Sequence, residues 1–482
     1  MDIDWKPHRK DTQPLYMQIV DYVKGKIREG EWVIGMVLPS QRELADLFEV
    51  NRSTIVAAMD ELKAEGIIEG RGKGGTKIIR DGLPSIIQPN WQAYIEEGIY
   101  IPNFKTIKQI NELEFENNMI RLSTGEASPS LFPTNKMSII LNEVAKGMKN
   151  LGYEEPKGMY YLREQISKYL KTYGICVSPS CILIVSGALQ AIQLIAMGIL
   201  QPGSSVFLEK PSYLYSLQIL QSVGMKRFGI PMDEEGIKAS LIPKYIRKHK
   251  SSILYTIPNF QNPTGIVMSQ RRRKQLMEVC QKEKIPIIED DVYRELWIDE
   301  KPPIPLKSLD THGLVLYVGS VSKTLSPGLR IGWIVGPEPV IDHLADMKMQ
   351  SDYGSSSLAQ FTVGKWLETG LYKEHLLFLR KELAIRRDIA LEILKKHFYS
   401  LATWEIPKGG YYVWLRLKDP INMYKLFDES CKIGILLYPG YIYDVEQNPY
   451  LRISYSYASI EELKTGLVKL SQLIHRMKSN HI

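Results

Sequence analysis

The chain has 482 residues, more than one hydrophobic core usually organises, so we expect at least two domains. Its 44% hydrophobic and 24% charged residues have the balance of a globular protein and exclude a disordered or repetitive chain. The net charge of +7 does not by itself indicate nucleic acid, because residues 1–80 carry as many acidic as basic side chains.

The chain shows no targeting or membrane signal. The segment MDIDWKPHRK lacks the apolar core of a signal peptide, and apolar runs such as AIQLIAMGIL are half the length of a membrane span. We therefore expect a cytoplasmic protein. The four cysteines form no CxxC pair and have no histidine at metal-ligand spacing, so we expect free thiols, no disulfide and no bound metal.

Three helices and a hairpin are predicted at the N-terminus. The first helix lies in PLYMQIVDYVKGKIREG, whose apolar residues recur at the spacing of one helical face. The second follows Pro39, and Ser40 and Glu43 form a capping box at its start. The third lies in NRSTIVAAMDELKAEG, where Asn51 can cap the helix and Gly66 ends it.

The first turn of the third helix is polar. The hairpin IIEGRGKGGTKII follows it, with two short β-rich arms around a glycine-rich, basic tip, as expected of a wing. A recognition helix enters the major groove N-terminus first and needs short donors and an arginine there. We therefore predict a DNA-binding domain, with a small protein-interaction domain as the alternative.

Residues 12–79 resemble the winged helix-turn-helix domain of the GntR family, through PLYMQI, LPSQRELA, VNRSTIVAAMDELKAEG and GRGKGGTKI. Glu49 departs from the pattern, since the family usually has glycine in this turn, and turn geometry or affinity is expected to differ. The resemblance implies that Arg42 and Arg52 contact DNA phosphates or bases. It implies that Ser53 and Thr54 contact the DNA backbone, with Asn51 also at the DNA surface. It places Arg71 and Gly72 in the wing, which contacts DNA as well.

The pattern weakens between residues 81 and 115. DGLPSIIQPN favours an extended connector, and WQAYIEEGIY a short amphipathic stretch. We therefore predict a first domain at 12–80, a linker and lead-in at 81–115, and a second domain at 116–482.

Short apolar runs alternate with segments of helical length from residue 116 onward. This order predicts a mainly parallel, three-layer α/β sheet. Functional groups in such sheets gather at the C-terminal ends of the strands. The runs are CILIVSG, SSVFLEK, SSILYTIP, IPIIEDD and LVLYVGS.

Polar groups follow four of these runs and match the requirements of pyridoxal phosphate. Lys323 can bond to the cofactor's aldehyde when it is deprotonated. Asp290, or alternatively Asp291, can keep the pyridine nitrogen protonated, so that the ring draws electrons from a substrate carbanion. Asn262 and Tyr293 can serve the phenolate oxygen. The candidates for the phosphate are Ser320, Ser322, Arg330 and the turn that opens a helix at Gly187, Ala188 and Leu189.

Residues 120–475 resemble the fold-type I, class I aminotransferases. The resemblance implies an α/β, pyridoxal-phosphate-dependent aminotransferase fold and a homodimer with its sites at the interface. One departure is GALQ in place of the usual G(S/A)QQ, so that a side-chain donor to the phosphate is missing at Leu189. The motifs, in order, are STGEASPSLFP, YEEPKGMYYLREQI, SGALQAIQ, KPSYLYS, NFQNPTG, EDDVY, SVSKTLSPGLRIGW and YLRISYS.

The same resemblance implies roles for further residues. Tyr213 would stack on the cofactor ring, and Tyr153 would reach the phosphate of a neighbouring subunit. Arg452 and Gly125 would bind the amino acid, with Arg452 on its α-carboxylate. An arginine suits this role because its planar fork pairs bidentately with a carboxylate.

A GntR-type domain followed by an aminotransferase-like domain is the layout of the MocR subfamily of bacterial transcription regulators. The resemblance implies a regulator that binds double-stranded promoter DNA and responds to pyridoxal phosphate, an amine or an amino acid. Because the sequence retains every group that transamination requires, a working aminotransferase with a DNA-binding appendage is the alternative. The polar start of the third helix favours the regulator.

Overall fold

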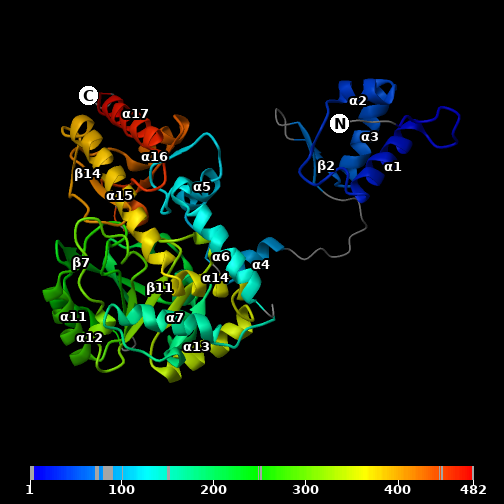
Figure 1. The fold of residues 1–482 in the computed structure, drawn as a ribbon. Coiled ribbons are helices and arrows are strands. Elements are labelled where there is room, and N and C mark those ends of the chain that lie inside the picture. Colours follow the sequence, from blue (N-terminus) through cyan, green and yellow to red (C-terminus); the bar gives the residue numbers. More distant parts are fainter. Residues whose placement is uncertain are drawn as a thin grey trace. The chain divides into compact units, whose positions relative to one another are not determined.

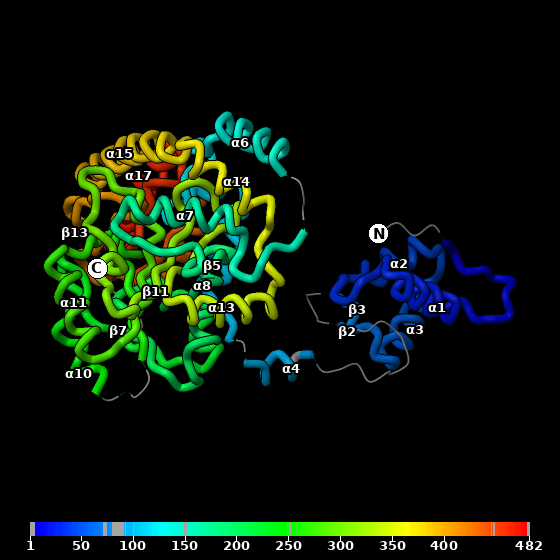
Figure 2. The backbone as a smooth tube through the Cα atoms, turned by 60° about the horizontal axis from the view of Figure 1, so that its bottom comes forward, coloured from blue at the N-terminus to red at the C-terminus, as the bar shows by residue number. Residues whose placement is uncertain are grey.

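The computed structural model forms two compact units, Met1–Glu97 and Gly98–Ile482, coloured along the chain in Figures 1 and 2. The division falls within the predicted linker and lead-in. In the part of the chain that the structure describes, no helix combines the length and apolar character needed to cross a membrane. The described residues are 5–70, 75–79, 91–99, 101–148, 152–247, 249, 252–444, 446 and 449–479.

In the described residues, three helices and a three-stranded sheet form the core of the N-terminal unit (Figure 1), and a fourth helix, α4 (Trp91–Glu97), is its last segment. The predicted apolar face of the first helix and the apolar face of the third helix are buried in one core, together with Phe48 and Ile78. The helices are α1 (Leu15–Arg28), α2 (Gln41–Phe48) and α3 (Arg52–Ala64), and the strands are β1 (Val37–Leu38), β2 (Ile68–Gly70) and β3 (Thr76–Ile78).

The predicted helix boundaries of this unit are largely confirmed. The capping box is present, because Glu43 N donates to Ser40 Oγ at 3.3 Å and Ser40 N donates to Glu43 Oε2 at 2.7 Å. Asn51 stands at the N-cap of α3, but its side chain makes no capping hydrogen bond. The sequence analysis missed β1, whose two residues pair with β3 and are too few to show an alternating pattern.

Glu49 ends α2 in the left-handed conformation, with φ 53° and ψ 46°. This conformation costs a residue other than glycine about 1–2 kcal/mol, which explains why glycine is usual there. The turn therefore keeps a glycine-type geometry although glutamate occupies it. Lys6 forms an exposed ion pair with the Glu49 carboxylate.

An eight-stranded sheet is the centre of the C-terminal unit, with the order β5-β12-β11-β10-β9-β6-β7-β8. The five predicted strands all belong to it and run in one direction, whereas β12 and β8 are antiparallel to their neighbours. The strands are β5 (Ile182–Val185), β6 (Ser205–Lys210), β7 (Lys226–Asp233), β8 (Gly236–Ile237), β9 (Ser252–Thr256), β10 (Ile287–Asp290), β11 (Val315–Ser320) and β12 (Gly332–Val335).

Helices cover both faces of this sheet, which gives the three layers that the alternating pattern predicts (Figure 2). Residues 183 and 185 of β5 pack with α8 and α13, and residues 182 and 184 pack with α7 and α14. The helices of this part are α6 (Thr134–Gly147), α7 (Tyr160–Lys171), α8 (Ala188–Ile199), α9 (Ile219–Ser222), α10 (Ile242–Ile246), α11 (Gln270–Glu283), α12 (Leu306–Leu309), α13 (Glu338–Ser351) and α14 (Ser357–Glu368).

A four-stranded sheet, with the order β13-β14-β17-β16, forms the second part of this unit. Two long helices, α15 and α17, lie side by side against it (Figures 1 and 2). The elements are β13 (Ala402–Trp404), β14 (Tyr412–Leu417), β16 (Tyr438–Pro439), β17 (Tyr450–Ser454), α15 (Leu371–His397), α16 (Met423–Lys432) and α17 (Ile460–Ser479), with β4 (Ile120–Arg121) paired to β15 (Ile435–Leu436).

The predicted linker contains two helices, α4 (Trp91–Glu97) and α5 (Lys105–Leu113). The sequence analysis did not predict α5 as a helix. Ile107 and Ile110 of α5 are buried in the main core of the C-terminal unit. Residues 105–113 are therefore part of this unit's fold.

Candidate ligand pocket and DNA-binding surface

A pocket of about 310 Å³ opens at the C-terminal ends of β9, β10 and β11, where β14 and β17 also contribute residues. Such strand ends are where ligands bind in open α/β sheets. The structure brings together there all the predicted pocket residues except Gly187 and Tyr153. The predicted residues that line the pocket are Gly125, Ala188, Leu189, Tyr213, Asn262, Asp290, Tyr293, Ser320, Ser322, Lys323, Arg330 and Arg452.

Lys323 lies in the loop after β11, and several contacts fix this loop. Its Nζ donates a hydrogen bond to the Gly125 carbonyl at 2.6 Å. Its own carbonyl accepts one from the Tyr411 hydroxyl. Ser322 N donates to Ser320 Oγ at 3.1 Å, and the Thr324 and Tyr372 hydroxyls lie 2.8 Å apart. The lysine is therefore held with its amine in the pocket.

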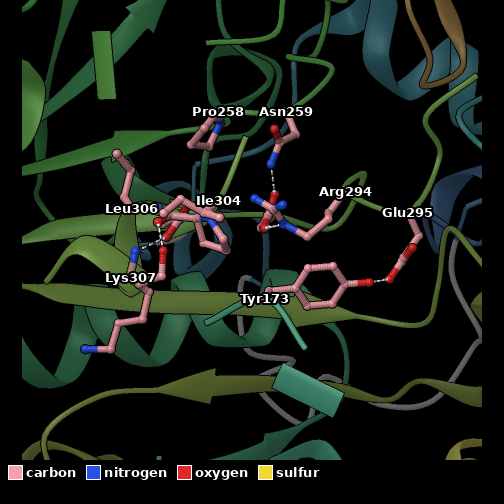
Figure 3. Close-up of polar contacts among 12 residues, drawn as sticks. Tyr173, Pro258, Asn259, Arg294, Glu295, Ile304, Leu306 and Lys307 are labelled. Atoms are coloured by element: carbon pink, nitrogen blue, oxygen red, sulfur yellow. Dashed lines mark hydrogen bonds and ion pairs between the residues drawn. The ribbon is translucent and has the colours of Figure 1, made fainter. Parts of the chain in front are cut away.

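Two neighbouring carboxylates at the end of β10 have different surroundings. Asp290 lines the pocket and accepts a hydrogen bond from the Tyr255 hydroxyl at 2.6 Å. Asp291 does not line the pocket, and its carboxylate contacts Asn259 and Arg294, whose side chains converge in Figure 3. Between the two alternatives of the sequence analysis, the geometry favours Asp290 as the residue that faces a ligand.

Burial raises the pKa of Asp290 to about 6, against the opposing effect of the Tyr255 hydrogen bond. As pH rises through this value, the folded protein must ionise a buried carboxyl that the unfolded chain has already ionised. In the protein without cofactor, Asp290→Asn should therefore raise the free energy of unfolding at about pH 8 by about 1–3 kcal/mol.

The same linkage fixes how this gain depends on pH. It should shrink below about pH 6 and disappear near pH 4, where both states bind the proton. Urea unfolding of the variant and wild type across this range measures it. A gain that is independent of pH would contradict the buried, raised-pKa carboxyl.

Arg452 is buried on β17 among three tyrosine rings. Its guanidinium lies 4.1 Å from the ring centre of Tyr412, 4.5 Å from that of Tyr438 and 5.1 Å from that of Tyr443. Burial alone would lower the pKa of Arg452, but the tyrosines outweigh it and hold the pKa above its ordinary value. The guanidinium is therefore a fixed positive charge in the pocket.

The hydrogen bonds of Arg452 leave part of this guanidinium unused. Its Nη1 donates to Asn262 Oδ1 at 2.8 Å, and its Nη2 donates to the Ser123 carbonyl at 2.6 Å. Its Nε is buried and has no hydrogen-bond partner among the described residues. Buried polar groups are normally satisfied, so this atom indicates a missing partner.

The pocket also presents donors suited to an anion. Arg330 Nη2 donates to the Ser186 carbonyl at 2.6 Å, and α8 begins at Ala188. A Cβ atom on Gly187 would lie 2.7 Å from Arg330 Nη2, so the arginine needs a glycine at this turn. Together with the Ser320 and Ser322 hydroxyls, the Arg330 guanidinium and the N-terminus of α8 are the kinds of donor that bind an anion.

The start of α3 forms a polar surface on the N-terminal unit. Asn51, Arg52 and Ser53 are exposed, Thr54 is partly buried, and Arg42 is exposed on α2. Farther along α3, Asp60 forms an ion pair with Lys63 and Glu65 forms one with Lys24. The acidic side chains Asp60 and Glu65 thus lie toward the C-terminal end of α3, where lysines pair with them, whereas Arg52 lies at its start. The predicted wing residues Arg71 and Gly72 lie outside the described residues.

Two family models match the two units. The model of bacterial regulatory proteins of the gntR family matches residues 15–78, and that of aminotransferase class I and II matches residues 117–470. The HTH-type transcriptional regulator YisV of Bacillus subtilis is 48% identical over 98% of both chains. NorG of Staphylococcus aureus, also an HTH-type transcriptional regulator, is 34% identical over 92% of this chain and all of NorG. The chain belongs to the gntR-type regulators that carry an aminotransferase domain.

Solved aminotransferases share the fold of this regulator's C-terminal unit. Kynurenine aminotransferase of Pyrococcus horikoshii, solved with PMP, has a TM-score of 0.75 and 30% identity, covering 80% of this chain and 98% of that one. The multiple substrate aminotransferase of Thermococcus profundus has a TM-score of 0.76 and 28% identity, covering 81% and 100%. The predicted fold-type I aminotransferase fold is therefore confirmed.

The regulator's pocket also contains residues that the sequence analysis did not select. Tyr412 and Tyr438 line the pocket beside Arg452, whereas Tyr443 and Tyr255 contact Arg452 and Asp290 without lining the pocket themselves. Tyrosine-rich segments such as GGYYVW and LLYPGYIYD were the available signal. Glu114, in the segment after α5, also lines the pocket and was not selected from the sequence.

Proposed function

We propose that this regulator is a cytoplasmic homodimer that binds double-stranded promoter DNA through α3 and holds pyridoxal phosphate in its C-terminal pocket. An amine or amino acid entering that pocket would change promoter activity. The observation that carries the proposal is one chain with both an exposed, polar helix start and a pocket containing Lys323, Asp290 and Arg452. The proposed DNA-binding domain is 12–80, the linker is 81–115 and the ligand-binding domain is 116–482.

The donor set of the pocket fits pyridoxal phosphate. When bound, this cofactor supplies an aldehyde that reacts with primary amines and a ring that withdraws electrons. Lys323 would be the amine that bonds to the aldehyde, and Asp290 would be the acid at the ring nitrogen, since both line the pocket. Asn262 and Tyr293, whose side-chain Nδ2 and hydroxyl oxygen lie 3.4 Å apart, would donate hydrogen bonds to the phenolate oxygen. The phosphate would lie among Ser320, Ser322, Arg330 and the turn at Gly187, Ala188 and Leu189.

The remaining predicted residues would complete the ligand site. Tyr213 would lie on the cofactor ring, and Arg452 would bind a carboxylate through its unpartnered Nε. Tyr153 is 83% exposed and packs edge-on against Tyr353 outside its own chain's pocket. This exposure supports the proposal that Tyr153 serves the pocket of a second subunit.

Covalent attachment at Lys323 is the direct test of the cofactor assignment. The purified protein with pyridoxal phosphate should absorb visible light, and borohydride followed by peptide mass spectrometry should place a pyridoxyl group on Lys323. Lys323→Ala should lose this adduct. Lys365→Ala, which alters a partly buried lysine outside the pocket, is the control and should keep the adduct. An adduct on another lysine, or none, would refute the cofactor proposal.

DNA binding is tested by Arg42→Ala and Arg52→Ala. Each should weaken specific binding by roughly 1–3 kcal/mol if the arginine contacts a base edge. If it contacts a phosphate instead, the slope of affinity against salt should fall by about one. Lys63→Ala, at the far end of α3, is the matched control. Gel shifts in which both arginine variants bind like wild type would refute the recognition-helix assignment.

A further inference from the structure

The pocket contains a carboxylate that neither the cofactor nor the Arg452 site requires. Glu114 follows α5, is partly buried and lines the pocket. Its Oε1 accepts hydrogen bonds from Thr124 Oγ1 at 2.9 Å and from the Tyr438 hydroxyl at 3.0 Å. Within the described residues, these two hydroxyls are its contacts and no cation pairs with it. Glu114 therefore brings an uncompensated negative charge to the pocket.

Three successive residues connect Glu114 to the other charged groups. The Ser123 carbonyl accepts from Arg452 Nη2 at 2.6 Å, Thr124 Oγ1 donates to Glu114, and the Gly125 carbonyl accepts from Lys323 Nζ at 2.6 Å. Consecutive Cα atoms are about 3.8 Å apart, so these three contacts occupy a short stretch of chain. One ligand of amino-acid length can therefore approach the guanidinium, the lysine amine and the carboxylate together.

Tyr438 stands between the two opposite charges. Its hydroxyl donates to Glu114, and its ring lies 4.5 Å from the Arg452 guanidinium. Burial and the Glu114 carboxylate raise the pKa of Tyr438, so the hydroxyl stays protonated and keeps donating. With this ring between them, the guanidinium and the carboxylate do not form an ion pair. Each charge remains available to an opposite charge on a ligand.

A second carboxylate strengthens the acidic character of this side. Glu126 also lines the pocket, and no described cation forms an ion pair with it. In contrast, Lys323, Arg330 and Arg452 all have roles in the proposed cofactor and carboxylate sites. A ligand with only a carboxylate and one amine would leave Glu114 without a cationic partner.

We propose that Glu114 selects ligands with a second cationic group, so that the compound sensed is a dibasic amino acid. The carboxylate of this amino acid would bind Arg452, its α-amine would lie where Lys323 holds the cofactor, and its distal ammonium would pair with Glu114. This inference rests on the proposed function, which assigns Arg452 and Lys323 these roles. The contrasting interpretation is that Glu114 only anchors Thr124 and Tyr438.

L-Ornithine and L-norvaline distinguish the two interpretations, because they differ by the terminal amine. Calorimetry on the full-length protein loaded with pyridoxal phosphate should show tighter binding of ornithine by roughly tenfold to a hundredfold. Glu114→Gln keeps an acceptor oxygen for Thr124 and Tyr438 but should lose most of this preference. Glu112→Gln removes the same charge from an exposed position on α5 and should keep it.

A charge reversal gives a second readout. Glu114→Arg should bind L-glutamate more tightly than ornithine, which a purely anchoring role would not produce. The inference is wrong if wild type binds both probes equally or binds neither, or if Glu114→Gln keeps the preference for ornithine. The borohydride adduct on Lys323 is scored in the same protein preparations before any amino acid is added, because the amine of a bound amino acid competes with Lys323 for the cofactor's aldehyde. If it forms while the preference is absent, only the ligand class is wrong; if it does not form, the proposed function fails as well.

Discussion

Replacing Asp291 by alanine should lower the free energy of unfolding by about 3–5 kcal/mol, because it leaves the charge of Arg294 buried without its partner. The Asp291 side chain is fully buried, and that of Arg294 is 3% exposed. Arg294 also donates to the Pro303 carbonyl at 3.0 Å, and Asn259 donates to Asp291 (Figure 3). Urea unfolding of the variant and the wild type measures the loss.

The neighbouring Asp290→Ala is the matched control. Asp290 forms no ion pair with a described residue, so its removal should cost far less stability while impairing cofactor binding. Arg294→Ala combined with Asp291→Ala should destabilise less than the sum of the single changes, because each single change already breaks the pair. Equal losses for Asp290→Ala and Asp291→Ala would contradict the separation of roles between the two carboxylates.

The two neighbouring aspartates, Asp290 and Asp291, show where sequence reasoning needed the structure. The motif EDDVY placed two aspartates at a strand end, and a chemical argument from residue type alone left Asp290 and Asp291 as alternatives. Successive side chains of an extended chain point to opposite sides, so only one of two neighbours faces a given pocket. The buried partner Arg294 decides between them, and it contacts Asp291 through the turn after the strand.

Features with a local signal were predictable. The apolar runs became strands of the large sheet, and the Ser40–Glu43 capping box formed as its spacing requires. The tyrosines around Arg452 were missed because long-range strand pairing assembles them: Tyr438 of β16 is in register with Arg452, and Tyr412 of β14 is in register with Ser454, two residues further along β17. No local pattern carries that register. Helix α5 was missed for a related reason, since burial against a distant core stabilises its short apolar face.

Two further variants should separate ligand sensing from DNA binding. Lys323→Ala removes the amine that bonds to the cofactor, and Arg452→Ala removes the partner of a ligand carboxylate. Both residues lie in the C-terminal unit, whereas α3 lies in the N-terminal unit. Both variants should therefore bind promoter DNA in gel shifts but lose the effect of an added amino acid. Couplings of this kind are typically about 1–3 kcal/mol, or roughly 5- to 150-fold in affinity.

The reciprocal control is Arg52→Ala, which should lose DNA affinity and keep the cofactor absorbance. Arg452→Lys is informative as well, because lysine keeps the charge but not the planar fork that pairs with a carboxylate, and it should restore little of the response. Promoter activity in a purified transcription reaction, with and without amino acid, gives the readout. Wild-type responses in both Lys323→Ala and Arg452→Ala would show that the pocket does not control the promoter.

The two variants also distinguish what the pocket senses. A ligand shifts an equilibrium only by its differential affinity for the two states, so a residue matters to the response only if the effective ligand contacts it. If pyridoxal phosphate alone is the signal, Lys323→Ala should abolish the response and Arg452→Ala should leave it intact. If an amino acid is the signal, both changes should abolish it, because the compound needs the bound cofactor and the guanidinium. A response lost only in Arg452→Ala would contradict both versions, since it would leave the lysine without a role.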